Sequence, residues 1–335
     1  MGDVAMTVPV LLTLQKKYPK LRFTVLSKPF LAPLFEQLPQ VDFYAAEVKG
    51  KHNGVGGLYK LFLELKKRNF TAVADLHGVI RSHVLSGFFR AMGTKVAKIN
   101  KGRSEKKALT RAKNKVFQPI KSTHQRYAEV FEKLGFPIAM GQPYFLEKRP
   151  ITTQIRQKLT ISGQKLIGFA PFAAHEGKKY PLHLVEQVIS ALAEKKDHKI
   201  LLFGGGNEET KQLNTLADKF NNTINLSGQF SFAEELDIIS NLNVMISMDS
   251  GNGHLAAIFG VPVITIWGVT HPYLGFAPYN QPEENQMLVD RKQFPLIPTS
   301  VYGNKIPEGY DKTMESILPQ KIVDQAHKVL NLGFF

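Results

Sequence analysis

Short apolar runs alternate with longer amphipathic stretches along the whole chain. Short apolar runs are typical of strands that are buried on both faces of a parallel sheet. Stretches with an apolar period near 3.6 residues are typical of helices that cover such a sheet. The pattern therefore predicts repeated βα units around parallel sheets, which is an α/β fold.

In the first half, the apolar runs predict strands at 22–26, 41–48, 72–76 and 95–99. Helices are predicted between them at 8–17, 57–68 and 81–92. Residues 103–115 are predicted to form a basic helix or a mobile loop. A further helix is predicted over 123–134, with Thr123 as its N-cap and Gly135 as its stop.

The composition changes near residues 147–152, after a stretch rich in Pro and Gly, and we place a domain boundary there. Residues 1–150 are predicted to form one domain and residues 151–335 a second. The alternation restarts in the second half, with strands expected at 166–172, 199–203 and 223–226 and helices at 182–194, 208–220 and 232–241. Residues 291–310 are expected to form an irregular surface loop. The amphipathic helix at 319–332 could pack back on the first domain.

The most informative segment is 243–268, NVMISMDSGNGHLAAIFGVPVITIWG. An apolar strand at 244–248 ends in Asp249-Ser250-Gly251, a short apolar helix follows at 254–259, and a second strand is expected at 261–267. The turn places unpaired backbone N–H groups at a helix N-terminus, which suits a phosphate or diphosphate. Two parallel-sheet domains also predict a cleft between them, with ligands at the carboxyl ends of the strands.

Length and composition limit the classes of protein that remain. A chain of 335 residues with 43% hydrophobic residues suits two α/β domains. No apolar stretch reaches the roughly 18 uncharged residues that a membrane span needs. The N-terminus lacks the basic segment of a signal peptide, and the chain has no cysteine. A cytoplasmic protein is expected.

The positive charge is concentrated in the first half. Residues 1–150 hold 27 Lys and Arg against 10 Asp and Glu, whereas residues 151–335 hold 16 against 18. The first half should therefore present a basic surface to nucleic acid, to an acidic lipid surface or to an acidic sugar acceptor. Basic residues scattered over solvated helix faces remain an alternative.

Three further loops of the second half follow predicted strands. Lys178, in the loop at 173–181, is a compact cation suited to a diphosphate, or else a solvated loop charge. Glycines at 204–206 precede Glu208 and Glu209, which could accept hydrogen bonds from ribose hydroxyls or cap the next helix. His254 is structural or a ligand contact, and the loop at 267–272 could line a base or sugar pocket.

The first half offers a candidate base and several candidate anion-binding cations. Asp3 lies at the start of a helix, where it could take a proton from an attacking hydroxyl or serve only as a helix-start carboxylate. Asp75-Leu76-His77-Gly78 ends another strand. The cations that could hold an anionic acceptor are Lys49, Lys51, Arg81, Arg103, Lys106, Lys107 and Arg111.

Several common nucleotide and metal motifs are absent from the sequence. The chain has neither GxxxxGK[ST] nor GxGxxG after the first strand of the second half, so P-loop and dinucleotide-binding interpretations are weak. It also lacks HExxH, and its ten histidines show no paired metal spacing. No cofactor and no metal are expected.

Taken together, these residues resemble the bacterial ADP-heptose:lipopolysaccharide heptosyltransferases, glycosyltransferase family 9. The resemblance covers nearly the whole chain. The most specific matching segment is DSGNGHLAAIFGVPVITIWG. The segment MGDVAMTVPVL adds strong support because of its position at the start of the sequence. The other matching segments are DLHGVIRS, THQRYAEVF, the KKYP loop and the GGG-N-E turn.

The resemblance implies a GT-B architecture, in which two Rossmann-like domains with parallel sheets face each other across a cleft. The first domain would bind the acceptor and the second the nucleotide sugar. By this resemblance Asp3 is the general base, Lys178 meets the donor diphosphate, and Glu208 or Glu209 lies near the ribose. The donor-phosphate loop would contain Asp249, Ser250, Gly251 and His254.

The resemblance further implies an inverting, metal-independent glycosyltransferase. It would move a sugar, expected to be a heptose, from an ADP-sugar to an anionic, lipid-linked acceptor of the lipopolysaccharide core. Lys178 and the helix N-terminus would stabilise the departing ADP in place of a metal. The basic first half would bind the acceptor and bring the enzyme to the inner face of the membrane as a peripheral protein.

Members of this family normally begin with an apolar strand before the Gly-Asp motif, whereas this sequence starts at the motif itself. That strand would lie in the middle of the first sheet, so the two strands beside it should lack a partner. Two other functions remain open: a nucleic-acid-binding protein that uses the basic half, and an inactive sugar-binding relative. The basic residues are not interleaved with aromatic ones, which weakens the nucleic-acid hypothesis.

Overall fold

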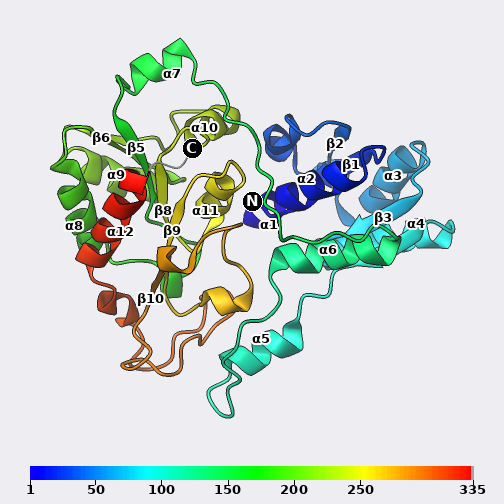
Figure 1. Cartoon of the computed structure of the whole chain (residues 1–335). Coiled ribbons are helices and arrows are strands. Elements are labelled where there is room, and N and C mark those ends of the chain that lie inside the picture. Colours follow the sequence, from blue (N-terminus) through cyan, green and yellow to red (C-terminus); the bar gives the residue numbers. More distant parts are fainter. Residues whose placement is uncertain (333–335) are drawn as a thin grey trace. The chain divides into compact units, whose positions relative to one another are not determined.

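The computed structural model describes residues 1–332 of the chain (Figure 1). The chain divides into two compact units, which are described separately. Unit 1 comprises Met1, Asp3–Arg103 and Lys121–Tyr144. Unit 2 comprises Gly2, Ser104–Ile120 and the described residues from Phe145 onward.

Unit 1 contains four short parallel strands and five α-helices. The strands are β1 (Phe23–Ser27), β2 (Val41–Ala45), β3 (Ala72–Asp75) and β4 (Lys95–Lys98). The helices are α1 (Gly2–Ala5), α2 (Thr7–Lys17), α3 (Gly54–Lys66), α4 (Ile80–Ala91) and α6 (Thr123–Leu134), and a 3-10 segment, η1 (Pro29–Phe35), follows β1.

The strands of unit 1 form two separate pairs. β1 pairs with β2, from Phe23 opposite Val41 to Ser27 opposite Ala45, and β3 pairs with β4, from Ala72 opposite Lys95 to Asp75 opposite Lys98. Within residues 1–332, β1 and β3 are not joined by ladder hydrogen bonds. Each of these four strands therefore has a ladder partner on one side, and the strand that the resemblance implies between the two pairs stays a prediction. α6 packs on β3 and β4, and α4 packs against the same two strands.

Helix α6 shows how local sequence fixes an element. Ser122 is its N-cap and accepts a hydrogen bond from the Gln125 backbone N–H, while the Gln125 side chain accepts from the Ser122 N–H. The prediction of Thr123 as the N-cap was therefore wrong by one residue. The predicted stop at Gly135 is confirmed: its φ of 102° lies in the left-handed region that glycine adopts without strain.

Unit 2 is built on one parallel sheet with the strand order β10-β9-β8-β5-β6-β7. Its strands are β5 (Lys165–Ala170), β6 (His198–Leu202), β7 (Thr223–Asn225), β8 (Val244–Met248), β9 (Val263–Trp267) and β10 (Gln286–Leu288). Its helices are α5 (Arg103–Thr110), α7 (Thr153–Lys158), α8 (Leu182–Ala193), α9 (Asn207–Ala217), α10 (Phe232–Ile239), α11 (Gly251–Ala257) and α12 (Pro319–Leu332). The 3-10 segments are η2 (Glu176–Lys178), η3 (Pro272–Leu274), η4 (Glu283–Asn285) and η5 (Thr313–Ser316).

Helices cover both faces of this sheet, with α8, α9 and α12 on one face and α10 and α11 on the other (Figure 1). Strands β8 and β9 are buried at every position, as expected for the centre of a doubly covered sheet. The apolar face of α12 lies in the core of unit 2, through residues such as Ile322 and Ala326. The same helix packs against α8, and its packing on the first domain stays a prediction.

The segment Ser104–Ile120 groups with unit 2 although it lies between two parts of unit 1 in the sequence. The guanidinium of Arg291 lies 3.4 Å from the centre of the Phe117 ring, and Lys115 donates hydrogen bonds to the carbonyls of Leu109 and Pro298 at 2.8 and 2.7 Å. Burial lowers the pKa of Lys115 to about 8, and the Arg291 charge adds to this effect. Cation–π contact and hydrogen bonds therefore hold this segment on unit 2.

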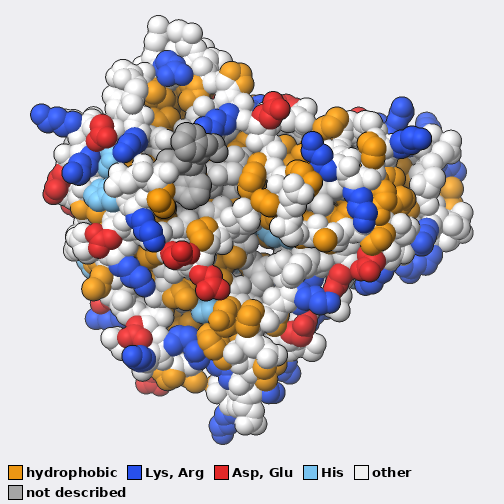
Figure 2. All heavy atoms as spheres, viewed as in Figure 1, with side chains coloured by type: hydrophobic (Ala, Val, Ile, Leu, Met, Phe, Trp, Pro, Cys, Tyr) orange, Lys and Arg blue, Asp and Glu red, His pale blue; other side chains and the backbone are white. Residues whose placement is uncertain are grey.

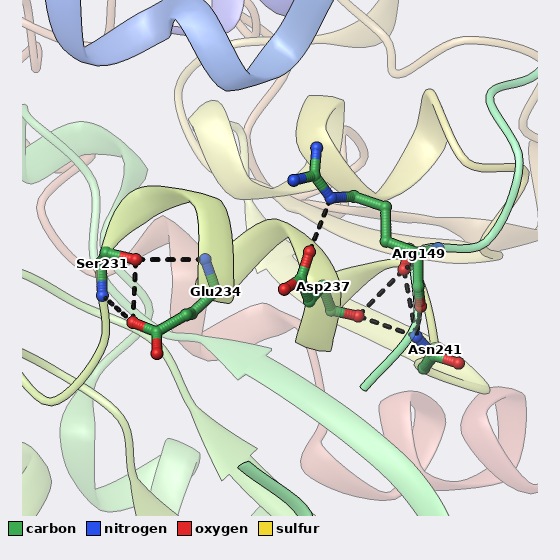
Figure 3. A network of polar contacts seen from close by, with 6 residues as sticks. Arg149, Ser231, Glu234, Asp237 and Asn241 are labelled. Atoms are coloured by element: carbon green, nitrogen blue, oxygen red, sulfur yellow. Dashed lines mark hydrogen bonds and ion pairs between the residues drawn. The ribbon is translucent and has the colours of Figure 1, made fainter. Parts of the chain in front are cut away.

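A polar network attaches the beginning of the Phe145–Leu332 segment to α10 (Figure 3). Arg149 Nε donates to Asp237 Oδ1 at 2.6 Å, and Asn241 Nδ2 donates to the Arg149 carbonyl at 2.7 Å. At the other end of α10, Ser231 and Glu234 form a capping box. The network fixes this segment beside the helix that precedes β8.

Among residues 1–332, no helix combines the length and the apolar character that crossing a bilayer requires.

Candidate functional site

Lys178 is held in place by the loop that follows β5. The loop is closely packed, and Gly177 is buried in it. The Gly177 N–H donates to the Gly303 carbonyl at 3.1 Å, and the Gly177 carbonyl accepts from the Val269 N–H at 2.8 Å. A Cβ added to Gly303 would lie 2.5 Å from Cγ of Lys178, so the Lys178 stem packs against the Gly303 backbone. Two neighbouring loops therefore define the position of this ammonium group.

The ammonium of Lys178 forms a nearly buried ion pair with Asp249, at the carboxyl end of β8. Its Nζ lies 2.7 Å from Asp249 Oδ2, with the two side chains only 15% and 6% exposed, and it donates to the Asp249 carbonyl at 3.3 Å. Thr270 Oγ1, which is fully buried, donates to the same Asp249 Oδ2 at 2.9 Å. The loops after β5, β8 and β9 thus converge on one carboxylate.

The first turn of α11 lies directly beside this ion pair in the sequence. Ser250 is the N-cap residue of α11, and its hydroxyl oxygen is buried with no hydrogen-bond partner among residues 1–332. A Cβ added to Gly253 would lie 2.7 Å from Ser247 Oγ, so this glycine lets the helix pack closely on β8. His254 is buried on the same helix. Backbone N–H groups of a first helical turn lack intrahelical partners and are available to an anion.

The glycine turn after β6 separates the two candidate carboxylates. Glu209 Oε2 accepts from the Gly205 backbone N–H at 2.8 Å and thereby stabilises the turn. The Glu208 side chain is 81% exposed, and its closest charged partner is Lys211 at 3.3 Å. The structure gives Glu209 the helix-start role that the sequence left open for both residues, and it leaves Glu208 accessible to a ligand.

The loop after β9 is closely packed. His271 Nδ1 accepts from the Tyr273 N–H at 3.1 Å, and the ring packs against Phe117 and Tyr273. Burial lowers the pKa of His271 to about 4, with a further contribution from the Arg291 charge, so this imidazole is neutral at pH 7. A Cβ added to Gly268 would lie 2.1 Å from the Gly177 carbonyl oxygen, which ties this loop to the Lys178 loop.

In unit 1, Asp3 lies on α1 with an exposed side chain. The buried Tyr127 of α6 donates from its hydroxyl to the Asp3 backbone carbonyl at 3.1 Å. Burial, assisted by the Asp3 charge, raises the pKa of Tyr127, so this tyrosine remains a hydrogen-bond donor at neutral pH. Tyr127 therefore fixes the backbone of Asp3 and leaves its carboxylate available to solvent.

The Asp75–Gly78 turn brings further charged groups close to Asp3. Asp75 Oδ1 accepts from the backbone N–H groups of His77 and Gly78 at 3.1 and 2.8 Å, which orients the turn. Partial burial of the His77 ring lowers its pKa, as do the nearby Lys101 and Arg81 charges, while the carboxylates of Asp3 and Asp75 oppose the shift. The lowered pKa favours the neutral form of the His77 imidazole, which lies within electrostatic range of Asp3.

The candidate acceptor cations do not form one cluster. Lys49 and Arg81 are exposed in unit 1, and Arg103 is the last residue of its first segment. Lys51 lies 3.5 Å from Glu47 and 3.9 Å from Glu64, so part of its charge is already neutralised. Arg111 belongs to unit 2, where its Nε donates to the Asn114 carbonyl at 2.6 Å. Lys106 and Lys107 lie on α5 in unit 2.

Three residues that position the candidate site residues were not predicted from the sequence. Thr270 holds Asp249, Gly303 packs against Lys178, and Lys101 lies beside Gly78, where an added Cβ would come within 3.1 Å of Lys101 Cε. Thr270 could have been predicted because it lies in the loop at 267–272, which was expected to contact a ligand. Gly303 could have been predicted from the high glycine and proline content of residues 291–310.

A cavity of about 480 Å³ lies within unit 2, and its walls offer hydroxyl, amide and ammonium groups without a carboxylate. One wall comes from the end of α5 and the other from the loop that also contains Gly303. Its lining residues are Thr110, Ala112, Leu296, Thr299, Asn304, Lys305, Ile306 and Pro307. Its volume is in the range of small-molecule sites, roughly 300–1,000 Å³.

Comparison with known sequences shows similarity to one family of glycosyltransferases. Residues 58–297 match the sequence profile described as glycosyltransferase family 9 (heptosyltransferase). The chain is 26% identical to lipooligosaccharide heptosyltransferase 2 of Haemophilus ducreyi, over 98% of this chain and 96% of that protein. It is 24% identical to lipopolysaccharide heptosyltransferase 3 of Escherichia coli, over 80% of each.

Solved structures resemble the chain over nearly its whole length. A family 9 glycosyltransferase from Veillonella parvula superposes with a TM-score of 0.74 at 20% identity, covering 99% of this chain and 95% of that one. E. coli heptosyltransferase WaaC with ADP gives 0.67 at 18% identity, covering 98% and 97%. These matches confirm the predicted α/β, GT-B fold class.

Proposed function

Since the chain belongs to glycosyltransferase family 9 (heptosyltransferase), we propose that it transfers a heptose from ADP-heptose to an anionic sugar of the lipopolysaccharide core. The names of its relatives support the acceptor, and E. coli WaaC, solved with ADP and with an ADP-2-deoxy-2-fluoro heptose, supports the donor. The observation that carries the proposal is the buried Lys178–Asp249 pair beside the Ser250 turn.

The donor diphosphate is proposed to bind at this turn. The Lys178 ammonium can contact an anion while it remains paired with Asp249, because an ammonium has three donors. The buried hydroxyl of Ser250 and the N–H groups that begin with Gly251 supply neutral donors. A diphosphate here satisfies a hydroxyl that otherwise has no hydrogen-bond partner among the described residues.

Asp249 is proposed to act through Lys178 and not by touching the phosphates. A carboxylate would repel a diphosphate, and its Oδ2 is already engaged by Lys178 and Thr270. Its charge orients the lysine, and its backbone carbonyl accepts from the same ammonium. The expected role of Asp249 in the donor-phosphate loop is thereby refined to a positioning role. His254 is proposed to support the same loop from the first turn of α11.

The exposed carboxylate of Glu208 is proposed to accept hydrogen bonds from the ribose hydroxyls of ADP. It lies in the first turn of α9, next to a glycine turn that a ligand can approach closely. Glu209 is the weaker candidate because its carboxylate is bound to the Gly205 N–H.

Asp3 is proposed to be the general base. Its carboxylate would accept the proton of the acceptor hydroxyl while that oxygen attacks the anomeric carbon on the face opposite to ADP. The new C–O bond forms as the bond to ADP breaks, which inverts the anomeric configuration. Lys178 would stabilise the negative charge that develops on ADP, a role that needs no metal ion.

The cations of the first half are proposed to bind the anionic acceptor and to bring the enzyme to the inner membrane surface. Of these cations, Lys49 and Arg81 are exposed in unit 1 and form no ion pair with a carboxylate among residues 1–332, and Arg103 and Arg111 supply charge near α5. Lys51 is the weakest member because Glu47 and Glu64 already pair with it.

Turnover tests the proposal directly. ADP release is measured with ADP-heptose and a heptose-deficient lipopolysaccharide core, in the presence of EDTA. We expect turnover that falls by at least about 100-fold in Asp3→Asn while ADP binding is unchanged. Glu132→Gln, an exposed carboxylate change on α6, is the control and should retain full activity. ADP binding without any turnover would support an inactive sugar-binding relative, and turnover abolished by EDTA would contradict the metal-independent mechanism.

A further inference from the structure

The exposed face of α3 and α4 carries an unusual concentration of apolar side chains. Thirteen large hydrophobic side chains are exposed among the described residues, and five of them lie on these two helices and the C-cap of α4. Their exposed fractions are 66% for Val55, 50% for Tyr59, 37% for Leu63, 82% for Ile80 and 54% for Met92. Clustering of this kind marks an interaction surface, whereas single exposed apolar residues do not.

The folding of unit 1 does not require these side chains to be apolar. Val55, Tyr59 and Leu63 recur every four residues and so form one stripe along α3. The opposite stripe, with Leu58 and Leu61 among its members, fills the core of unit 1. Tyr59 also packs edge-on against Phe88 of α4, at 5.4 Å between ring centres, which joins the two helices into one face.

The chain segment that forms this face is basic. Residues 54–92 hold six Lys and Arg against two acidic residues, and one of the six, Arg68, is paired with Asp42 outside this segment. Both acids are engaged: Glu64 binds Tyr44 and His52, and Asp75 binds the backbone of its own turn. The fully described helices α3 and α4 therefore present no unpaired carboxylate beside the apolar stripe. Figure 2 shows basic and apolar side chains interspersed over these helices.

We propose that the exposed face of α3 and α4, defined by Val55, Tyr59, Leu63, Ile80, Lys60 and Lys66, binds the surface of an anionic phospholipid bilayer. Apolar side chains enter the headgroup region while the lysines contact lipid phosphates. Tyrosine suits this depth because its ring is amphipathic. A second copy of the chain is disfavoured as the partner, because pairing this face with itself would place like charges against each other.

The surface also adjoins the candidate acceptor residues of unit 1. Val55 lies in the first turn of α3, four residues after Lys51, and Ile80 begins α4 immediately before Arg81 and three residues after His77. An enzyme bound through this face can reach a lipid-linked acceptor while the lipid stays in the bilayer. This inference depends on the proposed function only for the identity of the acceptor.

Co-sedimentation of the full chain with vesicles tests the surface. One set of vesicles contains equal parts of phosphatidylglycerol and phosphatidylcholine, and the other contains phosphatidylcholine only. We expect binding to the anionic vesicles, weakened by salt, and at least about tenfold weaker partitioning of the Val55→Ser/Leu63→Ser variant. Tyr302→Ser/Leu318→Ser removes two exposed apolar side chains of unit 2 and should bind like the wild type.

The charge contribution is tested by Lys60→Glu/Lys66→Glu against Lys195→Glu/Lys196→Glu, which changes the net charge equally on exposed lysines of unit 2. Only the first pair should abolish binding. Equal binding of all variants, or no vesicle binding by the wild type, would overturn the proposal. A self-association that is lost in Val55→Ser/Leu63→Ser without vesicle binding would assign the face to a second copy.

Activity separates this proposal from the proposed function. With the acceptor in anionic vesicles, Val55→Ser/Leu63→Ser should raise the KM for the acceptor at least about tenfold; with a lipid-free core oligosaccharide it should match the wild type. Vesicle binding without any transfer would overturn the proposed function and leave the surface standing. Transfer without vesicle binding would overturn the surface and the proposed approach to the membrane, and would leave the proposed transfer reaction standing.

Discussion

Lys178 shows how a residue that is unremarkable in the sequence obtains a defined position from its surroundings. Lys179 is its neighbour in the chain, yet Lys179 lies 37% exposed beside Glu176 while Lys178 is nearly buried against Asp249. The pairing of Lys178 depends on the loops after β5, β8 and β9, which are far apart in the sequence. Sheet topology therefore determines which of the two adjacent lysines pairs with Asp249.

The lysine pair provides a matched test of the donor site. Lys178→Ala removes a charge-assisted contact to the diphosphate and should weaken ADP binding by about 10- to 100-fold. Lys179→Ala removes an exposed surface charge and should leave the affinity within about twofold. Isothermal titration calorimetry with ADP measures both. Equal effects of the two substitutions would remove Lys178 from the donor site.

The positioning role of Asp249 predicts non-additive energetics. Asp249→Asn keeps the size of the side chain but weakens its hold on Lys178, so ADP binding should fall by about 3- to 10-fold. In the Lys178→Ala background the same change should cause no further loss of ADP binding, because no lysine remains to be positioned and the change removes a charge that repels the diphosphate. The double-mutant cycle is read from ADP affinities. Additive losses would mean that Asp249 contacts the nucleotide directly.

At the scale of elements, the sequence was most informative where burial is uniform. The predicted strand 244–248 matches β8 residue for residue because every position is apolar or small and buried. The predicted start of α3 came three residues late, since Gly54, Gly56 and Gly57 have low helix propensity, while Asn53 supplies the N-cap that begins the helix earlier. β10, only three residues long, and η1 were not predicted because neither produces a periodic signal.

The candidate site was predictable to the level of loops and not of contacts. The alternation of strands and helices placed Lys178, Glu208 and Asp249 at the carboxyl ends of strands, and the structure does so too. It could not show that Thr270 binds Asp249, because that contact requires β8 and β9 to be adjacent in the sheet. The capping role of Glu209, a contact four residues back along the chain, was among the alternatives that the sequence left open.

The packing of two loops against each other predicts a strong effect of one glycine. Gly268→Ala would place a methyl group 2.1 Å from the Gly177 carbonyl oxygen, so the backbone before Lys178 must move. We expect a loss of about 1–3 kcal/mol in the free energy of unfolding and weaker ADP binding. Gly141→Ala, where an added Cβ meets no atom within 4 Å, is the control. Chemical denaturation and calorimetry measure the two effects, and similar behaviour of both variants would contradict the assigned packing.

The loop after β9 should make stability sensitive to acid. The pKa of His271 is about 4 in the folded protein, below its ordinary value, so the unfolded state binds a proton first as the pH falls. The contribution of His271 to the free energy of unfolding is therefore fully present above about pH 6.5. It is lost as the pH falls toward 4, by as much as about 3 kcal/mol.

Substitution of His271 isolates that contribution. His271→Asn keeps an acceptor for the Tyr273 N–H but cannot be protonated, so its unfolding free energy should fall less steeply between pH 6.5 and 4. His183→Asn, on the exposed side of α8, serves as the control. Urea denaturation at a series of pH values measures the slopes. Parallel profiles for the wild type and His271→Asn would show that His271 does not govern acid sensitivity.

At the scale of the whole molecule, charge and chemistry are divided between the two halves of the sequence. The first 150 residues carry the entire positive excess, and they include Asp3, its neighbour His77 and the basic face of α3 and α4. The second half carries the large parallel sheet and the Lys178–Asp249–Thr270 cluster. This division agrees with the proposed function, in which the second half binds the nucleotide sugar and the first half binds the anionic acceptor.

The most direct measurement is a crystal structure of the full chain with ADP. The proposed donor site predicts diphosphate oxygens within hydrogen-bond distance of Lys178 Nζ, Ser250 Oγ and the Gly251 backbone N–H, with the Lys178–Asp249 pair intact. Nucleotide bound at any other position, or a diphosphate that leaves Ser250 and Lys178 without contact, would contradict it.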